Sequence, residues 1–181
     1  CNMDGNIRPN STQEKLDGLK LAFDPNGTVT AATSSPLTDG AAATLICEEN
    51  YAKQNNLDIL GRIISTAVEG CNPDYMGLGP IGATKKALSR ANLSIDKIDI
   101  FELNEAFASQ SLACIKDLEI DQSKINIDGG ALALGHPLGA TGARITGKAA
   151  DLLKRENKKY ALSTQCIGLG MGIATVIENI D

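Results

Sequence analysis

The sequence has no tryptophan, a single histidine and only 3% aromatic residues among its 181 positions. No apolar run approaches the roughly 18 residues that a membrane-spanning helix needs, so no membrane span is predicted. Its 17 Lys and Arg residues are outnumbered by 22 Asp and Glu, for a net charge of −5, and they form no basic cluster. A nucleic-acid or anionic-membrane surface needs local positive potential, so neither partner is expected.

Cysteines are few and show no paired spacing. They number five, an odd count without any Cys-x-x-Cys motif: Cys1, Cys47, Cys71, Cys114 and Cys166. This argues against a disulfide framework and a zinc ribbon, and it favours a reducing compartment. No metal site is predicted. The chain opens on Cys1 rather than methionine, which indicates a piece of a longer polypeptide whose targeting signal would lie outside it.

What is present is enough apolar material for a folded core. Hydrophobic residues make up 43% of the chain, which argues against disorder and coiled coil and fits one domain or slightly more. Residues 1–28 are polar and interrupted by prolines and a turn pair, as expected for the tail of another unit. From residue 29 onward apolar runs alternate with helical patterns, which is the α/β signature.

The predicted elements form one mixed sheet with helices between the strands. Five strands are expected, at Ala42–Cys47, Leu60–Val68, Ile98–Leu103, Tyr160–Gln165 and Ile173–Glu178. The last two are joined only by the glycine-rich Gly168–Gly172, too short for a helical crossover, so they should form a hairpin. Helices are expected at Pro80–Asn92, Ala108–Ile115 and Leu138–Leu152.

His136 lies in a glycine-rich stretch, Gly129–Arg144, that runs into the third predicted helix. Pro137 favours extended backbone at His136, and Gly135 removes steric limits before it, so the imidazole sits on a stiff turn near a helix N-terminus. An imidazole there can transfer protons near neutral pH. A histidine in a turn whose glycines serve only close packing fits the spacing equally well. No Gly-Lys-Ser/Thr follows, so the stretch is not a P-loop.

Cys166 begins a second motif, Cys166–Gly172, where one predicted strand ends and the hairpin turn starts. Proteins of the α/β class place sites at strand ends. The glycines let backbone N–H groups converge on an anion, which suits an oxyanion hole beside a thiol acid or base. Taken alone, the motif is better explained as an inert buried cysteine above a turn.

Asn104 and Glu105 follow the predicted strand Ile98–Leu103. They could orient a substrate or a water molecule, but capping of the next helix is the simpler interpretation of this pair alone. The stretch Ser34–Gly40 is likewise a turn and cap signal that by itself says little about ligands.

Together, the motifs Asn104–Ala108, Gly135–Pro137 and Cys166–Gly168, in this order and spacing, resemble the C-terminal part of the thiolase family. The resemblance covers essentially the whole chain. Further stretches that agree are Gly27–Thr30, Ser34–Ala43, Met76–Pro80 and Gly129–Arg144. The amino-acid sequences of Phe101–Leu118 and Ser34–Gly40 are most similar to those of degradative 3-ketoacyl-CoA thiolases of fatty acid β-oxidation.

The resemblance implies an acyltransferase that cleaves 3-ketoacyl-CoA with CoA to acetyl-CoA and a shortened acyl-CoA, or runs the reverse Claisen condensation. It implies a thiolase-like layered α/β fold with one five-stranded mixed sheet and helices on both faces. Residues 1–28 would end the family's loop domain, and residues 29–181 would form its C-terminal domain. Coenzyme A is a substrate, and no cofactor or metal is implied.

The resemblance also assigns roles to residues at matching positions. His136 would activate the nucleophilic cysteine and help bind the thioester oxygen, while Asn104 would hold the water that completes this oxyanion hole. Cys166 would be the second acid/base, moving the α-proton of the acetyl group. The backbone N–H of Gly168 would contribute to the second oxyanion hole.

For substrate binding, Ser35 would contact the pantetheine arm of CoA and Phe107 would lie along the pantetheine tunnel. The acylated cysteine of the family lies in its N-terminal half, and no other cysteine of this chain stands in a matching motif. The chain alone is therefore expected to be inactive, with that N-terminal half as its partner and acyl-CoA and CoA as substrates.

Other partners and the location follow from the family as a whole. A homo-oligomer, dimer or tetramer, is expected, and the degradative type can join a multifunctional β-oxidation subunit. The bacterial cytoplasm is the expected location, with mitochondria or peroxisomes left open.

Three alternatives stay open at this point. The first is a biosynthetic acetoacetyl-CoA thiolase, and the second is a non-catalytic acyl-CoA or lipid-binding module of the same architecture. The joint presence of His136, Cys166 and Asn104 favours an enzyme over that module. A thiol redox or metal site of Cys71, His136 and Cys166 is the third, and no ligand spacing supports it.

Overall fold

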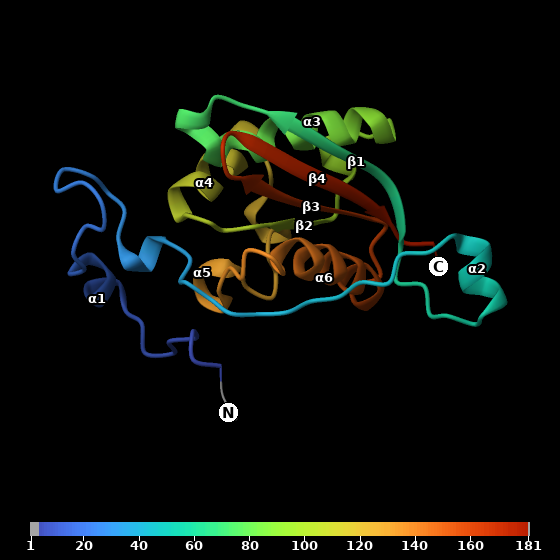
Figure 1. Ribbon diagram of the computed structural model, residues 1–181, viewed down its shortest axis with the longest axis horizontal. Coiled ribbons are helices and arrows are strands. Elements are labelled where there is room, and N and C mark those ends of the chain that lie inside the picture. Colours follow the sequence, from blue (N-terminus) through green and yellow to red (C-terminus); the bar gives the residue numbers. More distant parts are fainter. Residues whose placement is uncertain (1–3, 181) are drawn as a thin grey trace.

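The structure is a computed structural model and describes residues 4–180. One sheet is covered by α3 on one face and by α6 on the other, with α4 near α3 and α5 near α6 (Figure 1). The strands are β1 (Arg62–Gly70), β2 (Ile100–Leu103), β3 (Tyr160–Ile167) and β4 (Met171–Glu178). The α-helices are α1 (Gln13–Asp17), α2 (Glu49–Gln54), α3 (Gly79–Ala91), α4 (Ala108–Asp117), α5 (Ala131–Leu134) and α6 (Thr141–Arg155).

The sheet is mixed, as predicted. Its strand order is β1-β4-β3-β2, with antiparallel β1/β4 and β3/β4 pairs and a parallel β2/β3 pair. The hairpin predicted for the last two strands is confirmed, since Ile167 pairs with Met171 and Cys166 with Gly172. The parallel pair brings the carboxyl ends of β2 and β3 to the same edge of the sheet.

Each face of the sheet has its own core because side chains alternate along a strand. Phe101, Leu162 and Val176 point toward α3, and their neighbours Ala161 and Ile177 point toward α6. The helices contribute matching apolar faces, from Ala83, Ala87 and Leu88 on α3 and from Ala149, Leu152 and Leu153 on α6. Two of the three predicted helices therefore cover the sheet, one on each face.

The start of α3 lies directly against β4. A Cβ atom added to Gly172 would stand 2.1 Å from the carbonyl carbon and oxygen of Gly79, and one added to Gly79 would stand 2.2 Å from the carbonyl oxygen of Met171. Backbone therefore packs on backbone at this contact. Gly79 of the Met76–Pro80 stretch and Gly172 of the Cys166–Gly172 motif are required here because a side chain at either position would overlap the backbone of the other element.

We expect Gly172→Ala to lower the free energy of unfolding by about 3 kcal/mol, because α3 and β4 cannot both keep their places. Gly139→Ala is the matched control, since no atom of the described residues lies within 4 Å of that added methyl. Urea denaturation of the two variants measures the difference. Equal stabilities would contradict the close packing of α3 on β4.

The predicted strand Ala42–Cys47 is wrong, and the sheet has four strands among the described residues. This segment runs extended beside α6 toward α2 and pairs with no strand (Figure 1). Leu45 and Ile46 are 78% and 71% exposed. Apolar β-branched composition favours a strand, but a strand also needs a sheet edge to bond its backbone, and none lies beside it. Beyond β2, Ile125 adds only an isolated parallel bridge to Phe101.

The start of the third predicted helix also differs from the prediction. The helix expected from Leu138 begins at Thr141, because the carbonyl of Pro137 accepts the N–H groups of Ala140 and Thr141 and closes a separate turn first. Leu138 lies outside the helix and is 80% exposed. No helix among residues 4–180 combines the length and the apolar character needed to cross a bilayer.

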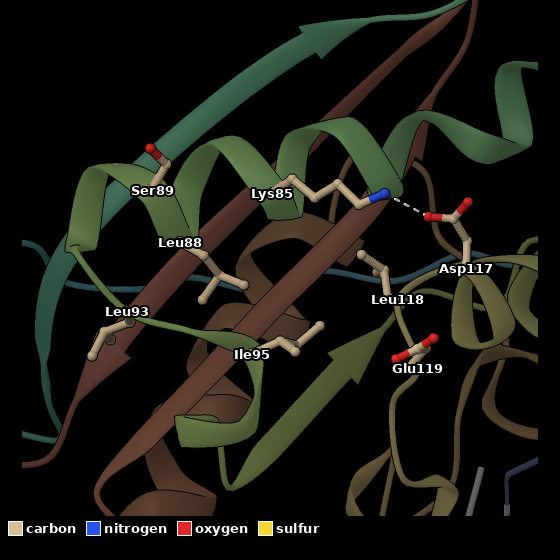
Figure 2. A pocket seen from close by; sticks show the side chains of 8 residues that line it. All are labelled: Lys85, Leu88, Ser89, Leu93, Ile95, Asp117, Leu118 and Glu119. Carbon is tan, nitrogen blue, oxygen red and sulfur yellow. Dashed lines mark hydrogen bonds and ion pairs between the residues drawn. The ribbon is translucent and has the colours of Figure 1, made fainter.

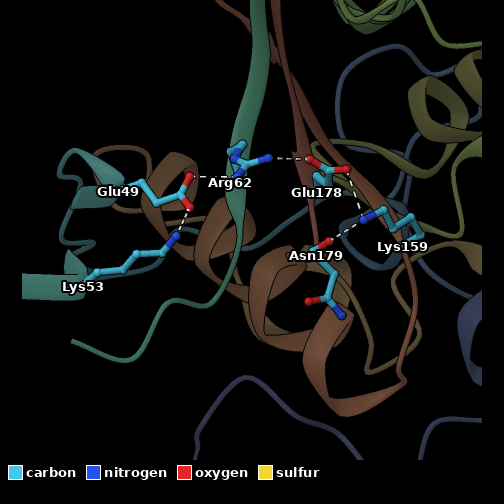
Figure 3. Close-up of polar contacts among 6 residues, drawn as sticks. All are labelled: Glu49, Lys53, Arg62, Lys159, Glu178 and Asn179. Carbon is cyan, nitrogen blue, oxygen red and sulfur yellow. Dashed lines mark hydrogen bonds and ion pairs between the residues drawn. The ribbon is translucent and has the colours of Figure 1, made fainter. Parts of the chain in front are cut away.

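A chain of ion pairs joins α2 to the sheet (Figure 3). Glu49 pairs with Lys53 and Arg62 at 2.6 and 2.7 Å, Arg62 pairs with Glu178 at 3.2 Å, and Glu178 pairs with Lys159 at 3.1 Å. Most of these side chains are solvent-exposed, so each pair contributes little to stability. They link α2 to the first residue of β1 and to the last residue of β4.

Candidate active site

The candidate site lies where β2 and β3 end. Asn104 follows β2 directly, and its backbone N–H donates to the carbonyl of Thr164 at 2.9 Å. Cys166 comes two residues later on β3. The parallel register therefore places Asn104 beside the end of the strand that carries Cys166, as the sequence motifs predicted for a strand-end site.

His136 is held by hydrogen bonds on both ring nitrogens. Its Nδ1 lies 2.7 Å from Thr141 Oγ1, and that hydroxyl donates its proton to the carbonyl of Pro137 at 3.0 Å. With its hydrogen already used, the hydroxyl must accept from Nδ1, so Nδ1 carries the imidazole proton. Nε2 faces Asn104 Nδ2 at 3.3 Å and acts as the acceptor. The geometry thus presents an unprotonated Nε2.

The backbone around His136 is equally constrained. Gly135 has φ +101°, a conformation that favours glycine, and an added Cβ would lie 2.4 Å from Thr38 Oγ1. The same Thr38 oxygen accepts the backbone N–H of His136 at 3.2 Å. The segment Ser34–Gly40, which the sequence indicated only as a turn, therefore supports the histidine directly.

Electrostatics keeps the imidazole neutral. Burial lowers the pKa of His136 below its ordinary value, and the positive charge of Arg144 lowers it further. Asn104 is buried, and its side-chain oxygen has no hydrogen-bond partner among residues 4–180. A neutral base and an unused buried acceptor therefore lie side by side.

The pKa of Cys166 is shifted in the opposite direction from that of His136. Burial raises the pKa of its thiol, and the neighbouring Cys71 raises it further. Burial also raises the pKa of Cys114 to about 11. Cys166 therefore keeps its proton at neutral pH, which suits a thiol that donates one. The sequence did not predict Cys114 near this site. The pairing of β1 with β4 brings Cys71 close to Cys166, and the packing of α4 brings Cys114 close to it.

Gly168 lies in the exposed turn between β3 and β4, two residues after Cys166. Within the described part of the chain, no atom lies within 4 Å of the place its Cβ would take. In the same turn, Leu169 adopts φ 71°, which is unusual for a leucine. The space beside Gly168 is open.

Ser35 and Phe107 also come together, although they are 72 positions apart in the chain. The N–H and the hydroxyl of Ser35 both donate to the carbonyl of Ala106, at 3.0 and 3.2 Å. Ser34 forms a β-bridge with Phe107, whose ring packs edge-on against Phe23 with centroids 6.4 Å apart. Ser35 therefore lies against the Asn104–Ala108 motif, which itself contains Phe107.

The positioning roles of several residues that hold the site were missed. Thr38 and Thr141 fix His136, and Glu105 holds the loop before it. Each of these three belongs to a motif that the sequence had singled out. Their partners lie 27 to 98 positions away or across a helix start, so single-sequence spacing cannot reveal the contacts.

A surface hollow of about 350 Å³ lies elsewhere, against α3 and the end of α4 (Figure 2). Leu88, Leu93, Ile95 and Leu118 give it an apolar lining, and the Lys85–Asp117 ion pair of 2.7 Å crosses its rim. It contains none of the predicted site residues. Across residues 4–180, no group of three or more His, Cys, Asp or Glu side chains could hold a metal ion.

Glu102 is a buried carboxyl group between β2 and α6, only 2% exposed. Burial raises its pKa from 4.5 to about 7, although Arg144 and Lys148 act in the opposite direction. One of its oxygens has no hydrogen-bond partner in the described residues. The folded chain therefore holds a proton that the unfolded chain has already lost at pH 6.

This carboxyl group should make stability fall as pH rises. Between pH 4.5 and about 7 the unfolded state releases the proton first, so we expect Glu102 to cost about 3 kcal/mol of unfolding free energy across that range. Glu102→Gln should be as stable as the parent at pH 4.5 and more stable at pH 8. Urea titrations at several pH values test this. A pH slope unchanged by Glu102→Gln, as expected for the exposed Glu119→Gln control, would refute it.

Comparison with known proteins gives the family. The family model described as the thiolase C-terminal domain matches residues 57–179, and that of the thiolase N-terminal domain matches residues 1–50. The expected boundary between residues 28 and 29 stays a prediction. The 3-ketoacyl-CoA thiolase of Aliivibrio salmonicida is 57% identical over 176 residues, and that of Salmonella typhimurium is 54% identical over 184. These matches cover 95% and 99% of this chain but 46% and 47% of those relatives.

Solved structures agree. Human mitochondrial 3-ketoacyl-CoA thiolase superimposes with a TM-score of 0.92 at 43% identity, over 99% of this chain and 45% of that one. Acetyl-CoA acetyltransferase from Bacillus anthracis gives 0.94 at 43% identity, over 97% and 44%. This chain thus spans a little under half the length of the relatives it matches. The sequence, the strand-end arrangement and these comparisons agree, and the chain belongs to the thiolase family.

Proposed function

We propose that this chain supplies the C-terminal half of a degradative 3-ketoacyl-CoA thiolase, which cleaves 3-ketoacyl-CoA with CoA to acetyl-CoA and a shortened acyl-CoA. The names of its relatives support this substrate class. The observation that carries the proposal is the neutral imidazole of His136, with Nδ1 on Thr141 and Nε2 beside Asn104. That geometry suits removal of a proton from a thiol.

In the first step, His136 Nε2 accepts the proton of the nucleophilic cysteine in the N-terminal half, and the thiolate attacks the 3-keto carbon. Asn104 holds a water molecule that, with His136, binds the oxygen on which charge develops. The bond between C2 and C3 then breaks. Its electron pair forms the enolate of acetyl-CoA and leaves an acyl group on the cysteine.

Cys166 completes the exchange. Its thiol, whose pKa is raised by burial, donates the proton to C2 of the enolate, while the N–H of Gly168 binds the enolate oxygen. The Cys166 thiolate then takes the proton of the incoming CoA thiol. The CoA sulfur attacks the acyl-cysteine and releases the shortened acyl-CoA. The departing cysteine thiolate takes back the proton held by His136, so both cysteines and the imidazole return to their starting forms.

Ser35 and Phe107 bind the pantetheine arm of CoA in this proposal. Ser35 is bonded to the Asn104–Ala108 motif that contains Phe107, which supports a substrate path that reaches the site from their side. A human mitochondrial 3-ketoacyl-CoA thiolase solved in complex with CoA superimposes on this chain with a TM-score of 0.91. The proposal includes a homo-oligomer, dimeric or tetrameric, and association with a multifunctional β-oxidation subunit. It places the protein in the bacterial cytoplasm and needs no cofactor.

A non-catalytic acyl-CoA-binding module is the competing function. Such a module has no need for an imidazole kept neutral beside an amide, or for a thiol kept protonated at the same sheet edge. Opposed pKa shifts in two groups of one site are typical of acid and base partners in catalysis. They favour the enzyme.

The test is CoA-dependent thiolysis of short- and long-chain 3-ketoacyl-CoAs. We expect no turnover from this chain alone, and turnover once it is joined to its N-terminal half. In the joined protein, His136→Ala should lower kcat by about 10³-fold, because general base catalysis is worth about 10² to 10⁴.

The exposed Glu119→Gln serves as the control and should keep the parent rate. Near-normal turnover by His136→Ala would remove the role given to this residue. A well-folded joined protein that binds acyl-CoA without turnover would instead establish the binding module.

A further inference from the structure

We infer that Glu105 is a positioning residue for His136: its carboxylate holds the start of the helical turn α5, whose other end carries the histidine. This rests on the proposed function, because positioning matters only if His136 acts in the reaction. Glu105 directly follows Asn104 at the end of β2. Asn104 would hold the imidazole of His136, and Glu105 would hold the turn α5 that precedes the histidine.

The first observation is the way α5 begins. Its N-cap is Gly130, which has no side chain to bond the first free N–H groups of the helix. Glu105 Oε2 accepts the N–H of Leu132 at 3.1 Å, as an N-cap side chain would. A Cβ on Gly130 would lie 2.1 Å from the Glu105 carboxyl carbon. The carboxylate therefore occupies the space of the missing cap.

The second observation explains why a carboxylate is needed. Glu105 Oε1 accepts from Asn126 Nδ2 at 2.7 Å. The amide of Asn126 cannot turn over, because its Oδ1 accepts the N–H of Leu103 and its Nδ2 donates to the Leu103 carbonyl, both at 2.9 Å. Two donors, Asn126 Nδ2 and Leu132 N, thus point at residue 105. Only a group with acceptors on both sides satisfies them.

The third observation connects this clamp, the two hydrogen bonds that the Glu105 carboxylate accepts from Asn126 and Leu132, to the histidine. The helix α5 is a single turn of four residues, closed where the N–H of Gly135 donates to the carbonyl of Ala131 at 2.9 Å. His136 follows at once. A shift at the Glu105 end therefore moves His136 relative to Asn104, which stays fixed by the sheet. Misplacement of a reacting group by about 1 Å can cost about 10² in rate.

Two substitutions test the clamp from opposite sides in the joined enzyme. Glu105→Gln keeps the size of the side chain but can accept only one of the two donors, and Gly130→Ala pushes the carboxylate away. We expect each to lower kcat at least tenfold, while KM for the acyl-CoA changes less than threefold. Glu119→Gln, the same chemical change at an exposed site, should keep both constants.

A double substitution shows whether the effect runs through this contact. In a Glu105→Ala background the space beside Gly130 is empty, so adding Gly130→Ala should change kcat less than twofold. General damage to the loop would instead multiply the two losses. If Glu105→Gln does not fold, as judged by its thermal melting curve, Gly130→Ala and the double variant decide by the same criteria.

His136→Ala separates failure of this inference from failure of the proposed function. Loss of turnover in His136→Ala with parent-like kcat in Glu105→Gln and Gly130→Ala would overturn the positioning role alone. Parent-like turnover in His136→Ala would overturn the proposed function itself. A rise in KM at unchanged kcat in the two clamp variants would also overturn the inference, since it would mark a binding effect.

Discussion

The parallel pairing of β2 with β3 is the constraint on which the proposed active site depends. It sets the carboxyl ends of the two strands side by side, so that Asn104 and Glu105 leave one strand beside the end that carries Cys166. His136 comes from a distant loop, yet it is bonded back to Asn104. Apolar residues on both faces of the sheet hold this pair in place, with Phe101 packed toward α3 and Ile100 toward α6.

Burial is the largest cause of the pKa shifts of both titratable groups in the site, and it shifts the two in opposite directions. Loss of water disfavours the charged form of each, so it lowers the pKa of His136 and raises that of Cys166. The imidazole is thereby ready to accept a proton, and the thiol is ready to donate one. A single environment at one edge of the sheet prepares a base and an acid.

Local pattern predicted most of the fold and the order of the site motifs. Periodicity located four strands and three helices, and the short Gly168–Gly172 connection predicted the hairpin. The prediction of a strand at Ala42–Cys47 failed because composition cannot show whether a sheet edge is near. For the site, the motifs predicted the neighbourhood of Asn104 and His136. The supporting contacts of Thr38, Thr141 and Glu105 could not be predicted. Those of Thr38 and Glu105 join residues far apart in the chain, and that of Thr141 spans the turn before α6.

The central claim is that the fold keeps His136 neutral with its proton on Nδ1. Because His136 is the single histidine of the chain, histidine labelled with ¹⁵N gives signals from this ring alone. At pH 7 we expect a protonated Nδ1 and an unprotonated Nε2, and we expect Thr141→Val, which removes the hydroxyl acceptor, to disturb this preference. A ring protonated on Nε2, or on both nitrogens, would contradict the claim.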